Sequence, residues 1–298
     1  MVSGYLQMSA ATLLAHALAA AIARSRDIKT LSLKGPVAEH YELRAPRVSA
    51  DADVLIEPDR FAEFCAALES YGWHTRVGRE TPALLPHHSV TYIHVDWPCD
   101  IDVHWMFPGF FADPEDVFSA LWDSRQEISV AHVPVQAPSK AGAAVIMALH
   151  AERDRRSPRH VEEQELVMKA LDETFTEAER AEFVEVARAG RAIWTLRDYF
   201  NAADLGPVVI DADSAQRQQW ELFSRRVDDA SSVAWWQRVR TAPWSQKPRW
   251  ILQAVWVSRR DVPRNDVERL PSRSELWAYQ ARRWRRGLEA TLRYFFRG

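Results

Sequence analysis

The chain has 298 residues, of which 47% are hydrophobic and 27% are charged. This composition is typical of a globular protein with a large core, and the length suits one large domain or two modest ones. The net charge of −3 excludes an overall electrostatic bias toward nucleic acid or membranes, although the C-terminal part is rich in arginine. The two cysteines, Cys65 and Cys99, are too few for a disulfide framework or a zinc site.

The apolar run at residues 9–23 predicts a core helix rather than a signal peptide. No basic residue precedes the run, His16 interrupts it, and Arg24 and Arg26 follow it. That charge order is wrong for secretion, and the run is short for a membrane span. We therefore expect a cytoplasmic protein without a membrane-spanning segment.

The segments that follow predict a mixed α/β sheet with helices on its faces. Runs of apolar and β-branched residues indicate strands, and turn residues punctuate them. Strands are expected at 28–33, 51–57, 73–77, 89–95 and 99–105, helices at about 36–43 and 58–72, and a hairpin around Asp96-Trp97-Pro98.

Beyond about residue 115 the pattern becomes almost entirely helical. A segment at 133–138 is the last plausible strand. We therefore expect an α/β domain over residues 1–135 and an all-α domain over residues 136–298. Helices are predicted at 139–153, 161–172, 176–189, 191–203, 214–228, 231–241, 247–258 and 273–296.

Two aspartate pairs carry the strongest chemical signal. Asp51 and Asp53 are two residues apart on a predicted strand, so their side chains share one face. Asp100 and Asp102 repeat the pattern on another strand, with His104 on the same face. A single Asp-x-Asp pair is most often solvated or caps a helix. Two pairs that each enter an apolar strand favour a divalent cation, Mg²⁺ or Mn²⁺, between the carboxylates.

Lys34-Gly35 follows the first predicted strand and opens a helix. A glycine at such a turn lets the backbone approach a phosphate closely, and the start of the next helix supplies N–H groups. The Lys34 ammonium adds a positive charge for phosphate oxygens. The turn therefore strengthens the prediction of a phosphoryl-transfer site.

Three segments in this order, LSLKGPVAEHY, RVSADADVLIEP and CDIDVHW, resemble the uncharacterised nucleotidyltransferase family of the polymerase-beta-like superfamily. The resemblance covers roughly residues 5–175, and some members occur beside lasso-peptide biosynthesis genes. It implies that residues 1–135 form a nucleotidyltransferase-like catalytic domain. Residues 136–298 would form the helical domain that completes the cleft for nucleotide and acceptor.

The resemblance also implies roles for the acidic residues. Asp51 and Asp53 match the metal-binding pair, and Asp102 matches the third carboxylate, the candidate base or second-metal ligand. Because Asp100 shares the predicted face of Asp102, only the match to Asp-x-His-Trp selects Asp102. His104 matches the family histidine, which either orients Asp102 or packs beneath it.

Nucleotide-binding residues follow from the same resemblance. Lys34 and Gly35 match the nucleotide-phosphate turn. Arg47 matches the arginine before the aspartate pair, either near the triphosphate or paired with an aspartate. The superfamily usually has Gly-Ser in the turn, whereas Pro36 follows Gly35 here, which leaves nucleotide binding less firmly implied than metal binding.

Supporting residues come from the predicted helical domain. His150 and Glu165 match the positions of a family histidine and a later acidic residue. Lys140 opens the first helix of this domain, where related enzymes direct a lysine at the triphosphate; the alternative is a solvated lysine. The basic loop 152–160 beside His150 either contacts an anionic acceptor or is solvated.

The C-terminal segment combines tryptophan with arginine. Trp277, Trp284, Leu288, Leu292 and Phe295 recur at helical spacing with arginines between them, which predicts an amphipathic basic helix. Such a helix either packs its aromatic side on the protein or docks RNA, an anionic peptide or a membrane surface. The family resemblance does not extend to this segment.

The sequence thus leads us to expect an Mg²⁺-dependent nucleotidyltransferase. It would move a nucleoside monophosphate from a nucleoside triphosphate, with ATP favoured, to an acceptor hydroxyl or phosphate. The expected acceptors are a ribosomal peptide or other natural product in a biosynthetic pathway, a small molecule, or RNA. The alternatives are a toxin-like nucleotidyltransferase that modifies tRNA, and a non-catalytic protein that binds nucleotide or peptide.

Overall fold

The computed structural model describes residues 6–76, 87–155, 157–225, 230–262 and 269–296. Contacts within the chain group these residues into two compact units. Unit 1 comprises residues 1–75 and 88–218, and unit 2 comprises residues 76–87 and 219–298.

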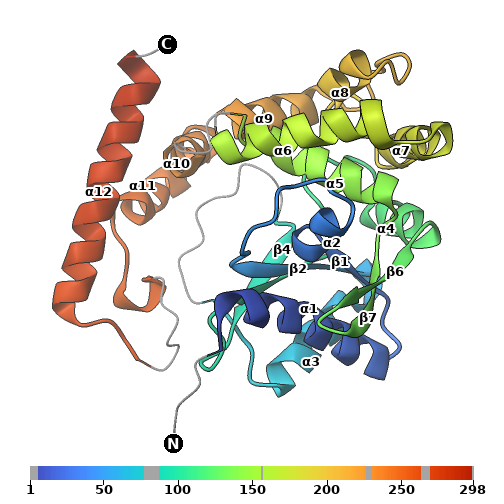
Figure 1. Ribbon diagram of the computed structural model, residues 1–298. Coiled ribbons are helices and arrows are strands. Elements are labelled where there is room, and N and C mark those ends of the chain that lie inside the picture. Colours follow the sequence, from blue (N-terminus) through green and yellow to red (C-terminus); the bar gives the residue numbers. More distant parts are fainter. Residues whose placement is uncertain (1–5, 77–86, 156, 226–229, 263–268, 297–298) are drawn as a thin grey trace, which may run out of the picture. The chain divides into compact units, whose positions relative to one another are not determined.

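A five-stranded mixed sheet forms the centre of unit 1 (Figure 1). Strand β2 is antiparallel to β1 and parallel to β5, and β5 continues antiparallel into β4 as the predicted hairpin. The mixed α/β fold expected from the sequence is confirmed. In sheet order the strands are β1 (Thr30–Leu33), β2 (Asp51–Ile56), β5 (Asp100–His104), β4 (Ser89–Ile93) and β3 (His74–Thr75).

The two faces of the sheet bury different sets of residues, because side chains alternate along each strand. One face packs on helices α1 (Met8–Ser25) and α3 (Phe61–Ser70), with Val54 and Val103 in its core. The opposite face carries Asp53 and Leu55 and belongs to the second core, toward α5 (Lys140–Glu152). Figure 1 shows α1 and α3 on one side of the sheet and α5 on the other.

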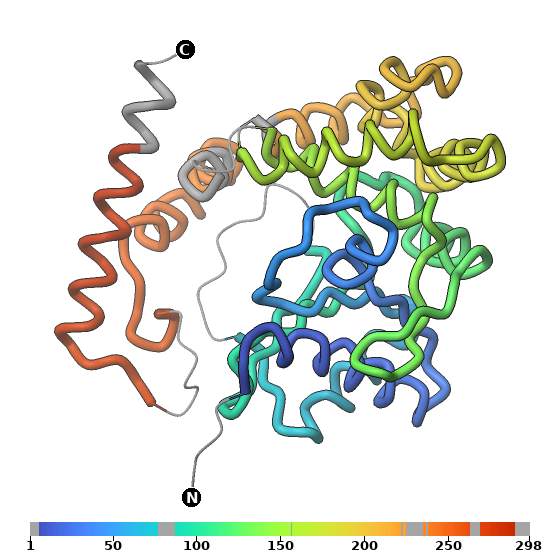
Figure 2. The backbone as a smooth tube through the Cα atoms, viewed as in Figure 1, coloured from blue at the N-terminus to red at the C-terminus, as the bar shows by residue number. Residues whose placement is uncertain are grey.

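The second core is built around α5, in which almost every residue is buried. Helices α6 (Pro158–Lys169) and α7 (Glu177–Ala189) pack against α5, and α4 (Pro114–Asp123) packs against α7. A separate hairpin, β6 (Gln126–Val130) with β7 (Val133–Ala137), lies against α1 and β1 (Figure 2).

Two elements of this region do not appear among the predicted ones. Strand β6 alternates buried Ile128 and Val130 with exposed neighbours over only five residues, which is too short for a clear period of two. Helix α4 begins at Pro114 after the N-cap Asp113, whose side chain accepts a hydrogen bond from the backbone N–H of Glu115. The predicted strand at 133–138 corresponds to β7.

The predicted division into domains at residue 135 stays a prediction. One hydrophobic core runs across that position, from Ala20 in α1 to Ala203 after α8 (Arg197–Ala202). Contacts instead separate the chain after Gln218, within α9 (Ser214–Arg225). Unit 2 then contains α10 (Ala230–Thr241), α11 (Lys247–Val255) and α12 (Arg273–Phe296).

Helix α1 is, within the described residues, the one helix long and apolar enough to cross a membrane by length and composition. Half of that 18-residue window is buried inside the protein. Most of its buried residues belong to the two cores of unit 1. The core helix of a globular protein can be equally long and apolar, so α1 is weak support for a membrane span.

Candidate active site

The parallel pairing of β2 with β5 brings the two aspartate pairs together. Asp51 lies opposite Asp100, and Asp53 lies opposite Asp102. Residues two apart share a face, and neighbouring strands are about 4.8 Å apart, so four carboxyl groups gather on one face of the sheet. The sequence predicts the shared face within each strand, and the pairing of β2 with β5 puts the two pairs side by side.

Asp53 is the most deeply buried carboxylate of this group, with 4% of its surface exposed. Its Oδ1 lies 2.5 Å from Lys34 Nζ and 3.0 Å from His104 Nε2. Burial alone would raise the pKa of Asp53, but the Lys34 ammonium and the contact with His104 together hold it well below its usual range. Asp53 is therefore ionised at neutral pH, and His104 contacts Asp53 rather than Asp102.

Asp102 stands beside this group and is partly exposed. Its Oδ1 accepts a hydrogen bond of 2.6 Å from the hydroxyl of Thr91, which lies opposite it on β4. Ligand atoms of Asp53, Asp102 and His104 all lie within 4.8 Å of one another. Two carboxylates and an imidazole at this spacing fit a divalent cation, and the oxygen donors suit Mg²⁺ or Mn²⁺.

Asp51 was expected to be part of this set. Its side chain is partly buried, and burial followed by the Asp53 charge raises the pKa of its carboxyl group. Asp102 raises that pKa further, so Asp51 lies within electrostatic reach of both carboxylates. The group with converging ligand atoms contains His104 in its place. The assignment of Asp51 as a direct metal ligand stays a prediction.

The Lys34-Gly35 turn has an unusual backbone. Lys34 has φ 47° and ψ −142°, and Gly35 has φ 35°. Residues other than glycine adopt such a conformation at a cost, and this is the turn that aims the Lys34 ammonium at Asp53. Helix α2 (Gly35–His40) follows directly, with Pro36 in its first turn. The predicted strand, turn and helix are confirmed here.

Replacing Gly35 by alanine is expected to destabilise the protein by about 1–3 kcal/mol. A Cβ at this position has to adopt the positive φ and lies 3.4 Å from Nε2 of the buried His16. Urea denaturation measures the change. Gly287→Ala is the matched control, because nothing lies within 4 Å of a Cβ there, and it should leave stability equal or slightly higher. Equal stability of Gly35→Ala and the native protein would contradict the strained turn.

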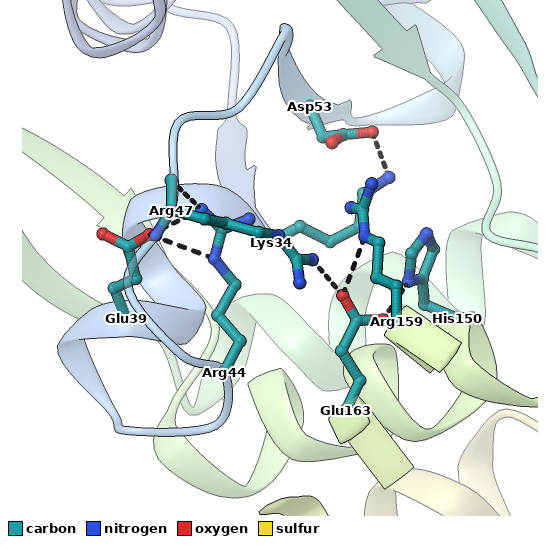
Figure 3. Close-up of polar contacts among 8 residues, drawn as sticks. All are labelled: Lys34, Glu39, Arg44, Arg47, Asp53, His150, Arg159 and Glu163. Atoms are coloured by element: carbon teal, nitrogen blue, oxygen red, sulfur yellow. Dashed lines mark hydrogen bonds and ion pairs between the residues drawn. The ribbon is translucent and has the colours of Figure 1, made fainter. Parts of the chain in front are cut away.

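A second polar cluster surrounds Glu163, whose side chain is 1% exposed. Glu163 accepts hydrogen bonds from the guanidinium groups of Arg47 and Arg159, and its Oε2 lies 2.9 Å from His150 Nδ1. Figure 3 shows these three side chains converging on Glu163, close to the contact between Lys34 and Asp53. Arg47 is thus in an ion pair, and its partner is a glutamate rather than the predicted aspartate.

The loop that carries Arg47 is held by its own contacts. The Arg44 guanidinium donates to Glu39 Oε1 and to the backbone carbonyl of Arg47, at 2.5 and 2.8 Å. Glu39 Oε1 also accepts from the backbone N–H of Arg47, at 3.2 Å. Figure 3 shows Glu39, Arg44 and Arg47 together with Lys34. The segment that leads into the Asp-x-Asp strand therefore has a fixed path.

His150 was expected to support the site together with Glu165. The structure gives His150 a different acidic partner, Glu163, whereas Glu165 is exposed on α6. Burial lowers the pKa of His150 to about 3, with Lys34 contributing. The ring is therefore neutral and bonded to an ionised carboxylate, because His150 and Arg47 keep the pKa of Glu163 well below its usual range despite burial.

Arginines at the corner between α5 and α6 add positive charge near the aspartates. The pKa of Arg153 is lowered by burial and raised by the charges of Asp53 and Asp102, and Arg159 lowers the pKa of Asp51. Arg153 and Arg159 therefore lie within electrostatic reach of the aspartates. The sequence predicted a basic loop at 152–160. In the structure Arg159, from the end of that stretch, pairs with Glu163 one turn later on α6.

Lys140 lies away from this site. Its ammonium donates to the Thr174 carbonyl at 2.9 Å and lies 3.6 Å from Glu179 Oε1 and over the Phe175 ring. Lys140 and His150 stand at opposite ends of α5, about 15 Å apart along the helix axis. The structure thus gives Lys140 a set of contacts within the helices rather than a place beside the aspartates.

His16 is completely buried, and neither ring nitrogen has a hydrogen-bond partner. Burial lowers its pKa from 6.5 to about 4; the Asp53 charge raises this pKa, while the Lys34 and Arg44 charges lower it. In the unfolded chain His16 binds a proton below pH 6.5, whereas in the folded state it stays neutral until about pH 4. The contribution of the neutral, buried His16 to the free energy of unfolding is therefore fully present above pH 6.5. It is lost as the pH falls, because the unfolded chain then binds the proton more readily.

His16→Leu is accordingly expected to reduce the pH dependence of folding. Between pH 7 and pH 5 the native protein should lose on the order of 2 kcal/mol more of its free energy of unfolding than the variant does. Urea denaturation at both pH values measures this difference. The exposed His74 provides the control, because His74→Leu should leave the pH dependence as it is. Equal losses in native and His16→Leu protein would be the contradicting result.

The fold and the site together define a class of enzyme. The mixed sheet presents aspartates from two parallel strands. A lysine-glycine turn and several arginines lie near these aspartates, and this arrangement has the form of a nucleotidyltransferase site. The model of the family described as uncharacterised nucleotidyltransferase matches residues 6–190. The chain belongs to this family, and we describe it from here on as a nucleotidyltransferase.

Comparison with known proteins adds likenesses of low identity. No curated protein matches the chain. Among solved structures, the antibiotic-resistance factor ANT(2'')-Ia is 21% identical with a TM-score of 0.39, and the match covers 67% of this chain and 97% of that one. A nucleotidyltransferase-like antigenic protein from Paracoccidioides brasiliensis is 11% identical with a TM-score of 0.39, covering 68% and 96%. The lincosamide antibiotic adenylyltransferase LnuA is 13% identical with a TM-score of 0.31, covering 59% and 96%.

Proposed function

We propose that this enzyme transfers a nucleoside monophosphate from a nucleoside triphosphate, with ATP favoured, to a hydroxyl or phosphate of an acceptor. The observation that carries the proposal is the β2–β5 register, which sets Asp53 beside Asp102 with Lys34 at the same place. We also propose Mg²⁺ or Mn²⁺ as the cofactor, held by Asp53 and Asp102 with Asp51 and His104 beside them. The cation would neutralise phosphate charge and lower the pKa of the acceptor hydroxyl.

The basic side chains around the aspartates suit the triphosphate. Lys34 extends from the turn, and Arg47 and Arg159 meet at Glu163 on the facing helix. Guanidinium groups bind phosphate oxygens through paired hydrogen bonds, whereas a lysine supplies a compact charge. We assign triphosphate binding to these three residues. Lys140 is left out because its ammonium is already bonded within the helices.

We propose that Asp102 accepts the proton of the acceptor. It is partly exposed, and the hydrogen bond from Thr91 fixes its carboxylate. The acceptor oxygen forms a bond to the α-phosphorus, the bond from that phosphorus to the bridging oxygen breaks, and pyrophosphate leaves. Asp102 takes up the proton of the hydroxyl. Holding the reactants in line and balancing their charge supply most of the rate enhancement.

We propose a peptide, another natural product or a small molecule as the acceptor, in the cytoplasm. The peptide and natural-product acceptors follow only from the sequence resemblance given above, in which some members occur beside lasso-peptide biosynthesis genes. The basic C-terminal segment supports the alternative of tRNA as the acceptor. A third possibility, a non-catalytic nucleotide-binding protein, is supported by Pro36 in the turn. Against it stand the retained carboxylates and their convergent geometry.

The test uses triphosphates labelled at the α-phosphate, with Mg²⁺ and candidate peptide, small-molecule and tRNA acceptors. We expect label to move to one acceptor class with the native protein and with Asp59→Asn, an exposed carboxylate outside the site. Asp51→Asn/Asp53→Asn should abolish the transfer, and circular dichroism checks that this variant is folded under the assay conditions. Transfer that survives in this variant would overturn the metal assignment, and triphosphate binding without transfer to any acceptor would favour the non-catalytic protein.

A further inference from the structure

The charges of the chain are strongly segregated along its sequence. Residues 219–298 contain 17 basic and eight acidic residues, a net charge of +9, and 16 of the 17 are arginine. Residues 1–218 contain 21 basic and 33 acidic residues, a net charge of −12. Eight of the 13 tryptophans also lie in the C-terminal 80 residues. The small net charge of the whole protein therefore conceals a basic, tryptophan-rich part outside the residues matched by the family.

Helices α11 and α12 of unit 2, with Trp256 directly after α11, expose several large apolar side chains, which we name the Trp–Leu surface. Trp256 contacts Trp277 and Trp284, with ring centroids 5.4 and 6.4 Å apart. The Trp284 indole N–H donates to the Val255 carbonyl at 2.7 Å. The surface consists of Leu252, Val255, Trp256, Trp277, Trp284 and Leu288, which are 39–66% exposed.

Helix α12 separates a packed face from this exposed one. Leu276 packs in a small core with Val257 and Val262. Buried Gln280 donates to the carbonyl of Val255 at the end of α11 and accepts from the backbone N–H of Val257. Trp277, Trp284 and Leu288 recur at spacings of seven and four and so share another face. Helix α12 therefore packs on the rest of unit 2 through the face of Leu276 and Gln280, and the face of Trp277, Trp284 and Leu288 stays exposed. Figures 1 and 2 show α11 beside α12 in orange and red.

Basic residues border the Trp–Leu surface. Successive helical residues are about 100° apart, so Arg273 and Arg285 fall at opposite edges of the face formed by Trp277, Trp284 and Leu288. Both arginines are exposed. Arg249, one turn before Leu252, is exposed at the start of α11. Apolar side chains bordered by arginines form the pattern of a helix that lies in the plane of a membrane interface.

We propose that the Trp–Leu surface of unit 2 binds the surface of an anionic phospholipid bilayer. The net charge of +9 is complementary to acidic headgroups. Tryptophan favours the interface, and leucine and valine enter the acyl boundary. The arginines at the edges reach the phosphates. The protein lies on the bilayer through α11 and α12, and the catalytic residues of unit 1 take no part in this binding.

Single-stranded RNA fits the same residues less well. RNA-binding surfaces present open aromatic faces on which bases stack. Here Trp277 meets Trp256 and Trp284 nearly edge-on, with interplanar angles of 80° and 72°. Leu252, Val255 and Leu288 offer neither a stacking face nor a hydrogen bond. A bilayer uses all six apolar side chains, whereas RNA leaves the aliphatic ones without a role.

The binding is measured by co-sedimentation of the full-length protein with vesicles of phosphatidylcholine alone or mixed equally with phosphatidylglycerol. We expect the protein to sediment with the mixed vesicles and much less with the neutral ones. Arg273→Gln/Arg285→Gln should weaken binding to mixed vesicles about 30-fold, since each basic residue near such a surface contributes about 1 kcal/mol.

A second pair of variants separates apolar insertion from charge. Leu288→Glu and Ala278→Glu change the net charge equally, and both positions are exposed on α12. Ala278 lies beside the Arg285 edge of the Trp–Leu surface, about a quarter turn from the line of Trp277, Trp284 and Leu288. Leu288→Glu should weaken vesicle binding at least tenfold more than Ala278→Glu does. Circular dichroism and nucleotidyl transfer should be unchanged in both, because neither residue belongs to the core or to the catalytic site.

Three results would overturn the proposal. The first is equal sedimentation with and without phosphatidylglycerol, and the second is equal binding by Leu288→Glu and Ala278→Glu. The third is tighter binding to a single-stranded RNA oligonucleotide than to mixed vesicles, lost in Leu288→Glu, which would assign the surface to nucleic acid. Failure of any of these kinds leaves the transfer reaction of unit 1 unaffected, so the two proposals are tested separately.

Discussion

Replacing Asp102 by asparagine is expected to lower the rate of nucleotidyl transfer by about 10²- to 10⁴-fold with little change in folding stability. The amide removes one negative charge from the Asp53–Asp102 pair and can no longer accept a proton from the acceptor. Its oxygen still accepts the hydrogen bond from Thr91. Stability should therefore stay within about 1 kcal/mol of the native value. Steady-state transfer and urea denaturation measure the two effects.

A substitution at Asp102 separates the effect on transfer from the effect on folding better than a substitution at Asp53. The Asp53 carboxylate is buried between Lys34 and His104, and removal of one partner from a buried ion pair costs about 3–5 kcal/mol. A loss of activity in Asp53→Asn would therefore be mixed with a loss of folded protein. Asp102 is partly exposed, so a loss of transfer there is specific to the chemistry.

Asp100→Asn is the matched control. Asp100 shares the strand and the face of Asp102, and the sequence pattern alone does not separate the two. The converging ligand atoms belong to Asp102 and not to Asp100, so Asp100→Asn should retain transfer within about tenfold of the native rate. Equal losses in both variants would show that the choice between the two aspartates is wrong.

Glu163→Gln is expected to destabilise the protein by about 3–5 kcal/mol. Glu163 is the common partner of Arg47, Arg159 and His150, and its carboxylate is almost completely buried. The neutral amide leaves the Arg47 guanidinium without its ion pair. The KM for the triphosphate should rise as well, because Arg47 then loses the contact that orients it. Urea denaturation and steady-state kinetics report the two changes.

Glu165→Gln, two residues later on the same helix, is the control. Glu165 is exposed, and its replacement should change stability by no more than about 0.5 kcal/mol. The double variant Arg47→Met/Glu163→Met should be more stable than the sum of the two single losses implies, because it removes both charges of the ion pair together. Additive losses in that cycle would contradict the coupling of Arg47 to Glu163.

Local sequence patterns predicted much of the site because its central residues lie within short elements. The strand that ends before Lys34-Gly35, the Asp-x-Asp strand and the hairpin around Asp96-Trp97-Pro98 all correspond to observed elements. Period-two alternation puts Asp51 and Asp53 on one face regardless of the rest of the fold. The aspartates that we propose as catalytic could therefore be named before their neighbours in space were known.

Residues whose position depends on the tertiary fold could not be predicted in this way. The acidic partner of His150 depends on the rotation of α6 against α5, and that packing selects Glu163 rather than Glu165. The contact between His104 and Asp53 requires parallel pairing across β2 and β5. Lys140 has a favourable place in the sequence, but its carbonyl and ring partners come from the segment after α6.

Binding of Mn²⁺ tests the central claim most directly, namely that Asp53 and Asp102 hold a divalent cation for nucleotidyl transfer. The loss of the free Mn²⁺ signal in electron paramagnetic resonance is measured with a non-hydrolysable triphosphate analogue present. The native protein and Asp59→Asn should bind Mn²⁺ equally, and Asp102→Asn should bind it at least tenfold more weakly. Equal binding by Asp102→Asn and the native protein would contradict the metal site described here.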